Sequence, residues 1–591
     1  MNVPSRLLDL AKIRFAPRTI TGAEEKLFLD AEAGRKVDAK VDKANPTKEI
    51  VSSEYVVWLC TDRSARDLVT HRGFQISNVQ VEGVLDLDDA QIPFPFKAVH
   101  CTFNGDICLE RARLPSLTLI NCSVRNIKAA GIHIEGEAEL NEGFIANGEV
   151  CFVAATIDGA LDFQGASLHN PKGVSLFANR AKIGGSLYLR RNFHSTGEIN
   201  LTRATIGSNL DLGDAQISNT GGEALSATST EIFGNVLLRR ACVTGAANFM
   251  AAKVHGFVDC EGAEFNHPIT KNPDLEFDGR ALIANSAKID GSVMLSDGFT
   301  AQGTLEFDKA EIGGILECTN ARLRQGEGAE LNLEQASAAA WRDDEDSWPK
   351  SGKLRLDGFT YKRIYGKSGS SDVHVRLAWL ELQAAGKFLP QPYEQLAATL
   401  RNMGHEAQAR MVMIEKNKAY AKFLRKHFTA QPGKPWRPFT RLRRQEWWWY
   451  NAFGKLIGYG YKPWRAFGLS VLVILFGTFL LHEGYKHRLI LPTHKDAYEK
   501  AVAGVPGVSA KPRLAPDYPR FNSFAYSIES FIPLLKFDQV SNWAPNGNQG
   551  EKSFMSAKGG SLLWGYLCLQ IVLGWILTSL WVGALTGLLK T

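Results

Sequence analysis

The sequence has little cysteine and none of the short motifs that mark common enzymes. Nine cysteines are spread over 591 residues, and no two of them form a Cys-x-x-Cys pair. The motifs Gly-x-Gly-x-x-Gly, Gly-x-x-x-x-Gly-Lys-Ser/Thr, His-Glu-x-x-His and Gly-x-Ser-x-Gly are also missing. Dinucleotide, nucleotide, zinc-protease and serine-hydrolase sites each depend on one of these spacings. The sequence therefore predicts no catalytic residue, no cofactor-binding residue and no metal ligand.

A strong net charge and an N-terminal targeting signal are missing as well. The formal net charge of +6 is small for this length and does not by itself indicate a nucleic-acid partner. The N-terminus lacks the apolar core of a secretory signal, and the sparse cysteines fit a reducing compartment. We expect the N-terminal part to be cytosolic and to bind no nucleic acid.

What the sequence does contain is an internal repeat. The template Ala-x-h-x-Gly-x-h-x-h, where h is an apolar residue, occurs at 155–163, 181–189, 287–295 and 310–318. Equivalent positions recur about every 11 residues, or every 22–23 residues with small insertions. Self-similarity at a fixed period is the signature of a repeat architecture.

Within each repeat the apolar residues alternate with a period of two, which is typical of a strand with one buried face. Stacked short strands bury such residues in one continuous column. We predict a mainly β fold, a β-helix (solenoid) over residues 76–365. Its clear repeats, from about residue 79 to 323, would form about ten turns with a length on the order of 50 Å. Ile289 and Ile312 should face inwards, and Lys288 and Glu311 outwards.

The cysteines and aspartates of the repeats are interpreted as structural. The cysteines that replace alanine or apolar residues, and are therefore expected in the core, are Cys101, Cys122, Cys151 and Cys260. The aspartates that the alternation places on the outer face, where solvation explains them, are Asp86, Asp88, Asp211 and Asp259. The acidic stretch Asp343–Asp346, which interrupts the last repeats, is expected to be a solvated insertion.

Helical segments are predicted on both sides of the solenoid. A solenoid must cover its end strands, and residues 1–75 have the pattern of a helical cap. Residues 370–430 predict a helical hairpin that resembles a tetratricopeptide unit. Because this covers only about one repeat, we expect it to dock a protein partner.

Two long apolar runs lie in the last third of the chain. Residues 466–482 and 562–589 are predicted to be transmembrane helices. Gly583 and Gly587 form a Gly-x-x-x-Gly match near the end of the second run, which is typical of close helix contact.

A basic and aromatic segment, 431–465, precedes the first run. Its lysines and arginines place it on the cytosolic side, with 483–560 outside. Aromatic residues interleaved with basic ones beside a span favour an anchor on anionic lipid over stacking on nucleic acid. The expected anchor residues are Trp447, Trp448, Trp449, Arg441, Arg443, Arg444, Trp464 and Arg465. Both termini and the solenoid should thus be cytosolic, on a membrane crossed twice.

Between the two runs, residues 521–532 have apolar positions at helical spacing. A short amphipathic helix between two spans resembles, weakly, the pore region of two-helix channel proteins. The resemblance implies that Glu529, Ser527 and Ser530 line a pore. The next segment, Leu534-Leu-Lys-Phe-Asp538, has no Thr-Val-Gly-Tyr-Gly filter, so potassium selectivity is not expected. A helix lying at the membrane interface is the alternative.

Taken together, the repeat template, Gln391–Ala397, Gly458–Ala466 and Tyr526–Pro533 resemble bacterial membrane-anchored repeat proteins of the pentapeptide-repeat style. The resemblance implies a bacterial inner (cytoplasmic) membrane location. Members carry the label "membrane-associated oxidoreductase". The repeat departs from the five-residue period of true pentapeptide repeats, so the square coil of that group need not apply.

Three functions are open. The chain is expected to be a membrane-tethered scaffold or sensor that binds a protein partner through the solenoid or the hairpin. The alternative is an ion channel or membrane-permeabilising effector, a homo-oligomer gated by the solenoid. An oxidoreductase activity has only the family label in its favour, and no cofactor is expected.

Overall fold

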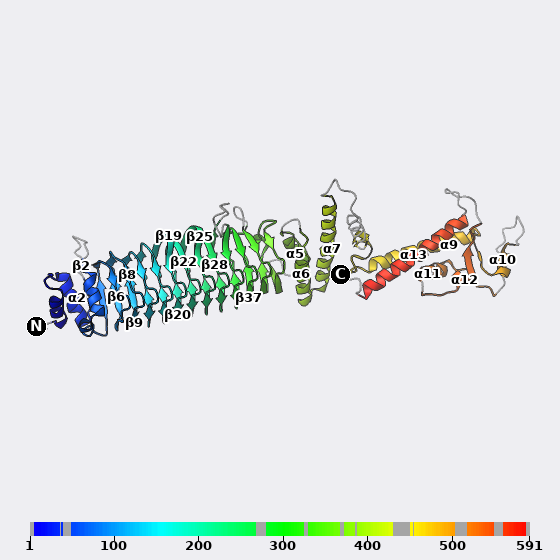
Figure 1. Cartoon of the computed structure of the whole chain (residues 1–591). Coiled ribbons are helices and arrows are strands. Elements are labelled where there is room, and N and C mark those ends of the chain that lie inside the picture. Colours follow the sequence, from blue (N-terminus) through cyan, green and yellow to red (C-terminus); the bar gives the residue numbers. More distant parts are fainter. Residues whose placement is uncertain are drawn as a thin grey trace. The chain divides into compact units, whose positions relative to one another are not determined.

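The computed structural model describes residues 5–35, 37–38, 49–267, 279–323, 329–366, 372–383, 387–429, 450–452, 454–502, 517–532, 534–548 and 559–586. The chain forms two compact units, Met1–Val412 and Met413–Thr591. The first is mainly parallel β structure, and the second contains two long helices (Figure 1).

The first unit is a β-solenoid of about 12 turns. It runs from β3 (Phe74–Ser77) to β41 (Thr360–Gly366), and all its strands pair in parallel within two sheets of 22 and 19 strands. In a typical early turn, β7 (Thr102–Phe103) and β8 (Ile107–Cys108) belong to one sheet. In the same turn β9 (Arg113–Leu114) and β10 (Leu117–Ile120) belong to the other. The solenoid has more turns than the ten expected because it begins before residue 79 and continues beyond residue 323.

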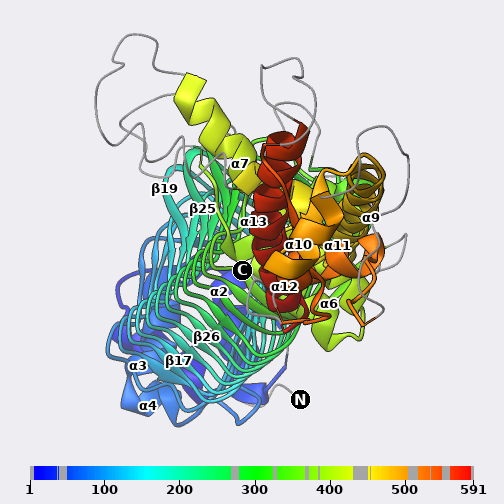
Figure 2. The same cartoon turned by 90° about the vertical axis from the view of Figure 1, so that its right-hand side faces the viewer.

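The predicted alternation is confirmed. In register, residues of successive turns stack in one buried column: Ile183, Ile206, Ile232, Val254, Ile289 and Ile312. The preceding residues are exposed, as Lys288 and Glu311 are, or partly exposed. Figure 2 shows the stacked turns that form this column. A period of two within short strands therefore identified the buried face correctly.

The 11-residue period comes from the corners of the coil. Asn78, Asp89, His100 and Arg111 lie 11 residues apart, and each has a positive φ, between 55° and 59°. Left-handed residues of this kind turn the chain sharply between strands. Two such corners complete a turn of about 22 residues, so one repeat of 11 is half a turn.

The residues that make some turns longer than others lie on one side of the coil. Long strands β19 (Ser167–Phe177) and β25 (Gln216–Ser226) alternate with the shorter β22 (His194–Asn200) and β28 (Cys242–Asn248). Gly197, at φ +111°, lies beneath the first long strand, where a Cβ would come within 2.2 Å of the carbonyl oxygen of Asn170. The turns thus alternate in length without disturbing the buried columns.

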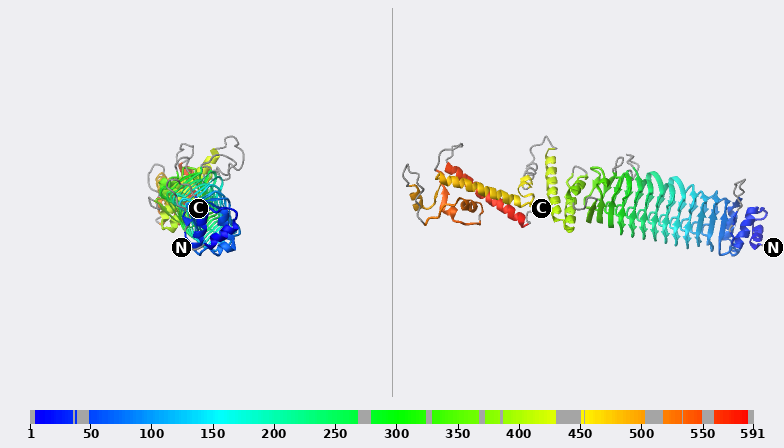
Figure 3. Two further views of the ribbon diagram at one scale, coloured as in Figure 1. Left: turned by 90° about the vertical axis from the view of Figure 1, so that its left-hand side faces the viewer. Right: turned by 180° about the vertical axis from the view of Figure 1, so that it is seen from behind.

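Helices cover the N-terminal end of the solenoid, as predicted (Figure 3). They are α1 (Arg6–Arg14), α2 (Gly22–Ala33), α3 (Ser53–Thr61) and α4 (Arg63–Arg66). The side chains of Phe28, Tyr55 and Trp58 pack edge to face, with ring centroids 5.5–5.9 Å apart. Strand β2 (Glu49–Ser52) pairs with β4 (Val79–Glu82), so the cap also shields the first strands of a sheet.

The C-terminal end is covered by α5 (Val373–Leu380) and α6 (Gln391–Asn402), followed by α7 (Glu406–Thr429). The Trp379 ring of α5 stacks on Trp341 of β39 (Ser337–Asp343) at 5.8 Å. On α6, Gln395 Nε2 and Thr399 Oγ1 donate to the Tyr361 carbonyl at 2.6 and 2.9 Å. Part of the predicted helical hairpin therefore serves as the second cap.

The expectation of a solvated acidic insertion is wrong for Asp343 and Asp344, which are 1% and 5% exposed. The Asp343 carboxylate lies 2.6 Å from Arg376 Nη1 of α5 and also accepts from Trp348 Nε1. Asp344 accepts from the backbone N–H groups of Asn320 and Ser347. Asp343 thus joins α5 to the last turns, and Asp344 accepts hydrogen bonds from backbone N–H groups there.

The second unit contains α9 (Trp464–Lys486) and α13 (Gly559–Leu585), with the short α11 (Ser523–Phe531) packed against both. Between them lie α10 (Lys495–Val502), α12 (Gln539–Asn542), and an antiparallel pair formed by β42 (Ile490–Pro492) and β43 (Trp543–Pro545). Both long helices are long and apolar enough to cross a membrane.

Candidate functional site

Three of the four cysteines predicted in the solenoid core are buried. Cys101, Cys122 and Cys260 are at most 1% exposed, whereas Cys151 is partly buried. Burial raises the pKa of the Cys260 thiol, which keeps it protonated and unreactive. No group of three or more metal-ligating side chains occurs among the described residues.

The solvation predicted for four outward-facing aspartates is wrong for two of them. Asp211 and Asp259 are 7% and 0% exposed. Each accepts from the backbone N–H two residues later, in Gly213 and Glu261, at 3.0 Å. Each also pairs with an arginine, Asp211 with Arg190 at 2.8 Å and Asp259 with Arg239. They stabilise corners of the coil, whereas Asp86 and Asp88 are exposed.

A pocket of about 350 Å³ lies at the C-terminal end of the solenoid. It is lined by Thr319, Asn320, Arg342, Asp343, Asp344, Tyr365 and Gly366. Its two aspartates bind Arg376 and backbone N–H groups, and its Arg342 pairs with Glu317 at 3.3 Å. The pocket's charged groups are thus engaged by partners within the first unit, and we place the candidate site in the second unit.

The outer faces of α9 and α13 are apolar and exposed. Only 22% of the most apolar stretch of α9 and 28% of that of α13 is buried within the chain. Large exposed side chains include Leu472, Leu475, Phe476, Phe479, Trp564, Leu569, Val572 and Trp575. A helix in the core of a soluble protein would bury such residues.

Aromatic side chains gather at both ends of this helix pair. Near the start of α9, the Phe467 ring contacts Trp464 and Trp581 with centroids 6.1 and 6.0 Å apart. Near its end, Tyr485 stacks on Phe521 at 4.6 Å and meets Trp543 at 5.5 Å. The distance between the two ends of the 23-residue α9 is about 35 Å.

Helix α11 lies deep against the helix pair. Phe521, just before α11, lies at the Tyr485 end, whereas Phe531 belongs to a buried cluster with Ala466 and Leu577, nearer the other end. A Cβ on Gly574 of α13 would come within 1.9 Å of the Phe531 carbonyl oxygen. Only glycine at position 574 therefore permits this approach.

The centre of the interface is polar. Ser527 Oγ donates to the Ile474 carbonyl at 2.8 Å, and Gln570 Nε2 donates to Ser527 Oγ at 2.8 Å and to the Ser527 carbonyl at 2.9 Å. Ser527 and Gln570 are both 0% exposed. Ile474 and Gln570 lie near the middles of α9 and α13, and Gly477 leaves space for the Gln570 amide. These bonds join the three helices where apolar packing would be least specific.

The side chains of the three predicted pore residues all form hydrogen bonds with other groups of the same chain. Ser527 belongs to the central interface, and Ser530 Oγ donates to the Tyr526 carbonyl at 2.7 Å. Glu529 Oε2 accepts from the backbone N–H groups of Gln539 and Val540, at 2.8 and 3.2 Å. Glu529 therefore caps the start of α12 and ties it to α11.

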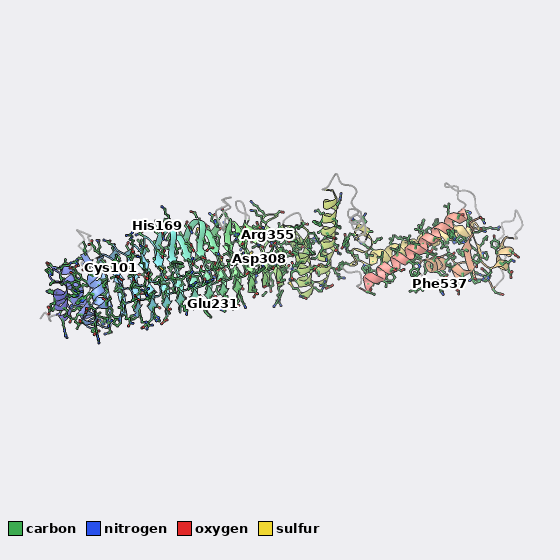
Figure 4. All side chains as sticks on the ribbon, in the orientation of Figure 1. Cys101, His169, Glu231, Asp308, Arg355 and Phe537 are labelled. Atoms are coloured by element: carbon green, nitrogen blue, oxygen red, sulfur yellow. The ribbon has the colours of Figure 1, made fainter. Side chains whose placement is uncertain are left out.

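After α11 the chain returns through residues Leu534–Asp538, here called the return segment. The backbone N–H of Leu535 donates to the Ile532 carbonyl, at the end of α11. Gln539 Oε1 accepts from the backbone N–H of Asn522, at the start of α11. The described residues of the return segment are all exposed, Leu534 at 90% and Phe537, labelled in Figure 4, at 49%. Sequence reasoning noted this segment only for its lack of a filter motif.

Of the predicted membrane anchors, Trp464 is 75% exposed and Arg465 is exposed at the start of α9. Gly583, predicted to make a helix contact, is partly buried within α13. The other predicted anchors and Gly587 lie outside the described residues; these anchors are Trp447, Trp448, Trp449, Arg441, Arg443 and Arg444.

The molecule thus combines a closed, capped solenoid with a helix pair into which a third helix is inserted. No protein-family model, no curated protein and no solved structure matches the chain, so the resemblance to pentapeptide-repeat membrane proteins has no support from these comparisons.

Proposed function

We propose that the second unit crosses a membrane twice, through α9 and α13, and that several copies of the chain together form an ion path. Two spans in one chain cannot enclose a path, so its walls must come from several copies. The solenoid would lie on the cytosolic side of the membrane, as the lysine and arginine bias of 416–465 favours. A bacterial inner membrane with anionic lipid is the location that we propose.

The surface of the helix pair supports insertion in a bilayer. Its exposed apolar residues would face lipid, and its two aromatic groups are separated by roughly the thickness of a hydrocarbon core, about 30 Å. Trp464 and Arg465 at the start of α9 suit the membrane interface.

The return segment is the observation that carries the ion path. With α9 and α13 across the bilayer, α11 would enter from the Tyr485 side and pass the mid-plane, and the chain would return as non-helical backbone. Exposed non-helical backbone is not tolerated against lipid; it occurs at such depth only where protein covers it or where it lines water. A return segment that lines a water-filled path between copies meets this requirement.

We expect full-length protein in liposomes to pass small ions faster than protein-free liposomes. Gly574→Ala should abolish the flux, because its Cβ would collide with the Phe531 backbone and displace α11. Gly468→Ala is the matched control, since a Cβ at position 468 of α9 would meet no atom within 4 Å. Both changes otherwise favour helix by about 1 kcal/mol. The measurement is dilution-driven flux followed with an ion-sensitive dye.

The competing proposal is a membrane-tethered scaffold or sensor that binds a protein partner through the solenoid. Its support is the long, regular surface of a solenoid closed at both ends. Absence of flux from the parent protein, at every protein-to-lipid ratio, would contradict the ion path and favour the scaffold.

The proposed topology predicts the labelling of single cysteines in intact cells. Glu499→Cys, exposed on α10, should react with an impermeant thiol reagent, and Lys418→Cys, exposed on α7, should react only after the cells are opened. The parent chain controls for the nine native cysteines. The reverse pattern would place the solenoid outside, and labelling at neither position in intact cells would contradict the exposure of 483–560.

A further inference from the structure

We propose that Lys536 of the return segment makes the ion path selective for small anions such as chloride. This inference rests on the proposed ion path and assigns its substrate class. Rings of lysine or arginine favour anions in pores, as rings of aspartate or glutamate favour cations. Helix α11 and the return segment together are here called the inserted hairpin. The charges of this hairpin therefore decide the class of ion.

Three charged side chains lie in the hairpin between Asn522 and Gln539, namely Glu529, Lys536 and Asp538. The Glu529 carboxylate is held by the backbone N–H groups of Gln539 and Val540 and faces the inside of the hairpin. Lys536 and Asp538 are exposed on the return segment. They are the charges that a copy can present to an ion.

Lys536 lies deeper than Asp538. It directly follows Leu535, which is bonded to the end of α11 at Ile532. Asp538 directly precedes Gln539, whose backbone N–H is bonded to Glu529 and whose side chain is bonded to Asn522, so Asp538 lies nearer the start of α11. Charges act more strongly on an ion where the surroundings exclude water, because the effective dielectric constant is lower there. Lys536 should thus dominate the deepest part of the path.

The C-terminal end of α11 opposes this effect, but with a smaller charge. The dipole of a helix is equivalent to about half a negative charge at its C-terminus. Lys536 carries a whole positive charge and is exposed beside Ile532, whereas the negative charge of Glu529 is held by backbone N–H groups inside the hairpin and that of Asp538 lies nearer the start of α11. With several copies around one axis the charges of Lys536 add.

The occupant of the surface beside the return segment is a second copy of this chain. Lys536 and Asp538 are costly to expose to lipid, and so is the non-helical backbone that carries them. Leu534 and Phe537, 90% and 49% exposed, flank the lysine and would pack between copies. Copies related by rotation about one axis would cover the apolar residues and leave the charges in water.

The test is the reversal potential of full-length protein in planar bilayers of neutral lipid under a potassium chloride gradient. The parent should show a chloride-to-potassium permeability ratio above one. Lys536→Gln should lower this ratio, and Lys536→Glu should bring it below one. Asp538→Asn is the matched control, because Asp538 lies nearer the start of α11, and this variant should keep the ratio above one.

Each result decides a separate question. A parent that conducts but prefers potassium, or a ratio that Lys536→Glu leaves unchanged, would overturn the anion assignment and leave the ion path standing. A silent parent would contradict the ion path itself and the assignment with it. Elution of the detergent-solubilised variants at the parent's volume in size-exclusion chromatography shows that a changed ratio does not reflect misfolding.

Discussion

Ile289→Asp is expected to destabilise the solenoid by several kcal/mol, because it places a carboxylate in a dry column of stacked side chains. Ile289 is 4% exposed and lies in register between Val254 and Ile312. Each turn of a solenoid is stabilised mainly by its two neighbours, so the damage should be greatest in the turns next to residue 289. Thermal unfolding by circular dichroism measures the loss, and hydrogen exchange locates it.

Lys288→Asp is the matched control, since the same side chain is introduced one residue earlier on the exposed face. Its effect should stay within about 0.5 kcal/mol. Ile312→Asp and Glu311→Ala form a second pair one turn further along. Equal melting temperatures for the two members of either pair would contradict the register.

Arg376→Met is expected to destabilise the C-terminal cap by about 3–5 kcal/mol, because it leaves the Asp343 carboxylate buried without its counter-charge. The two side chains are 2% and 1% exposed, and Arg376 Nη2 also donates to the Tyr365 carbonyl at 2.8 Å. The α5 helix should then detach from the last turns. Limited proteolysis measures the detachment, and thermal unfolding measures the loss of stability.

Two further variants separate the ion pair from general effects of removing an arginine. Arg363→Met changes an exposed arginine on the neighbouring strand and should have little effect. Asp343→Asn combined with Arg376→Met removes the uncompensated charge and should be more stable than Arg376→Met alone. A double variant no more stable than the single one would show that packing of the arginine, and not its charge, holds the cap.

The solenoid could be predicted because each of its strands is specified by a short stretch of sequence. The alternation around Ile289 identifies the buried face, and the repeat period identifies the stacking. The prediction of a solvated side chain failed at Asp211 and Asp259, because an arginine of a neighbouring turn, Arg190 or Arg239, pairs with each carboxylate. It failed again at Asp343, whose partner Arg376 lies 33 residues away on a helix without repeat character.

The candidate site was predicted only in part. Helical spacing indicated the region of α11, and hydropathy indicated the two long apolar helices, α9 and α13. The depth of α11 depends on three residues of the long helices: Gly574 leaves room for the α11 backbone, Gly477 leaves room for the Gln570 amide, and Gln570 bonds α11. These residues have no periodic pattern in the sequence. The role of Lys536 depends on that depth, so it could be proposed only once α11 was placed against both long helices.

The insertion of α11 also sets an order of events during synthesis. Ser527 and Phe531 are made more than 40 residues before their partners Gln570 and Gly574. At about 5–20 residues per second, several seconds pass in which α11 has only α9 to pack against. The hairpin can settle only when α13 has been made, so a ribosome that stalls before residue 574 leaves an unfinished second unit with the complete solenoid already made.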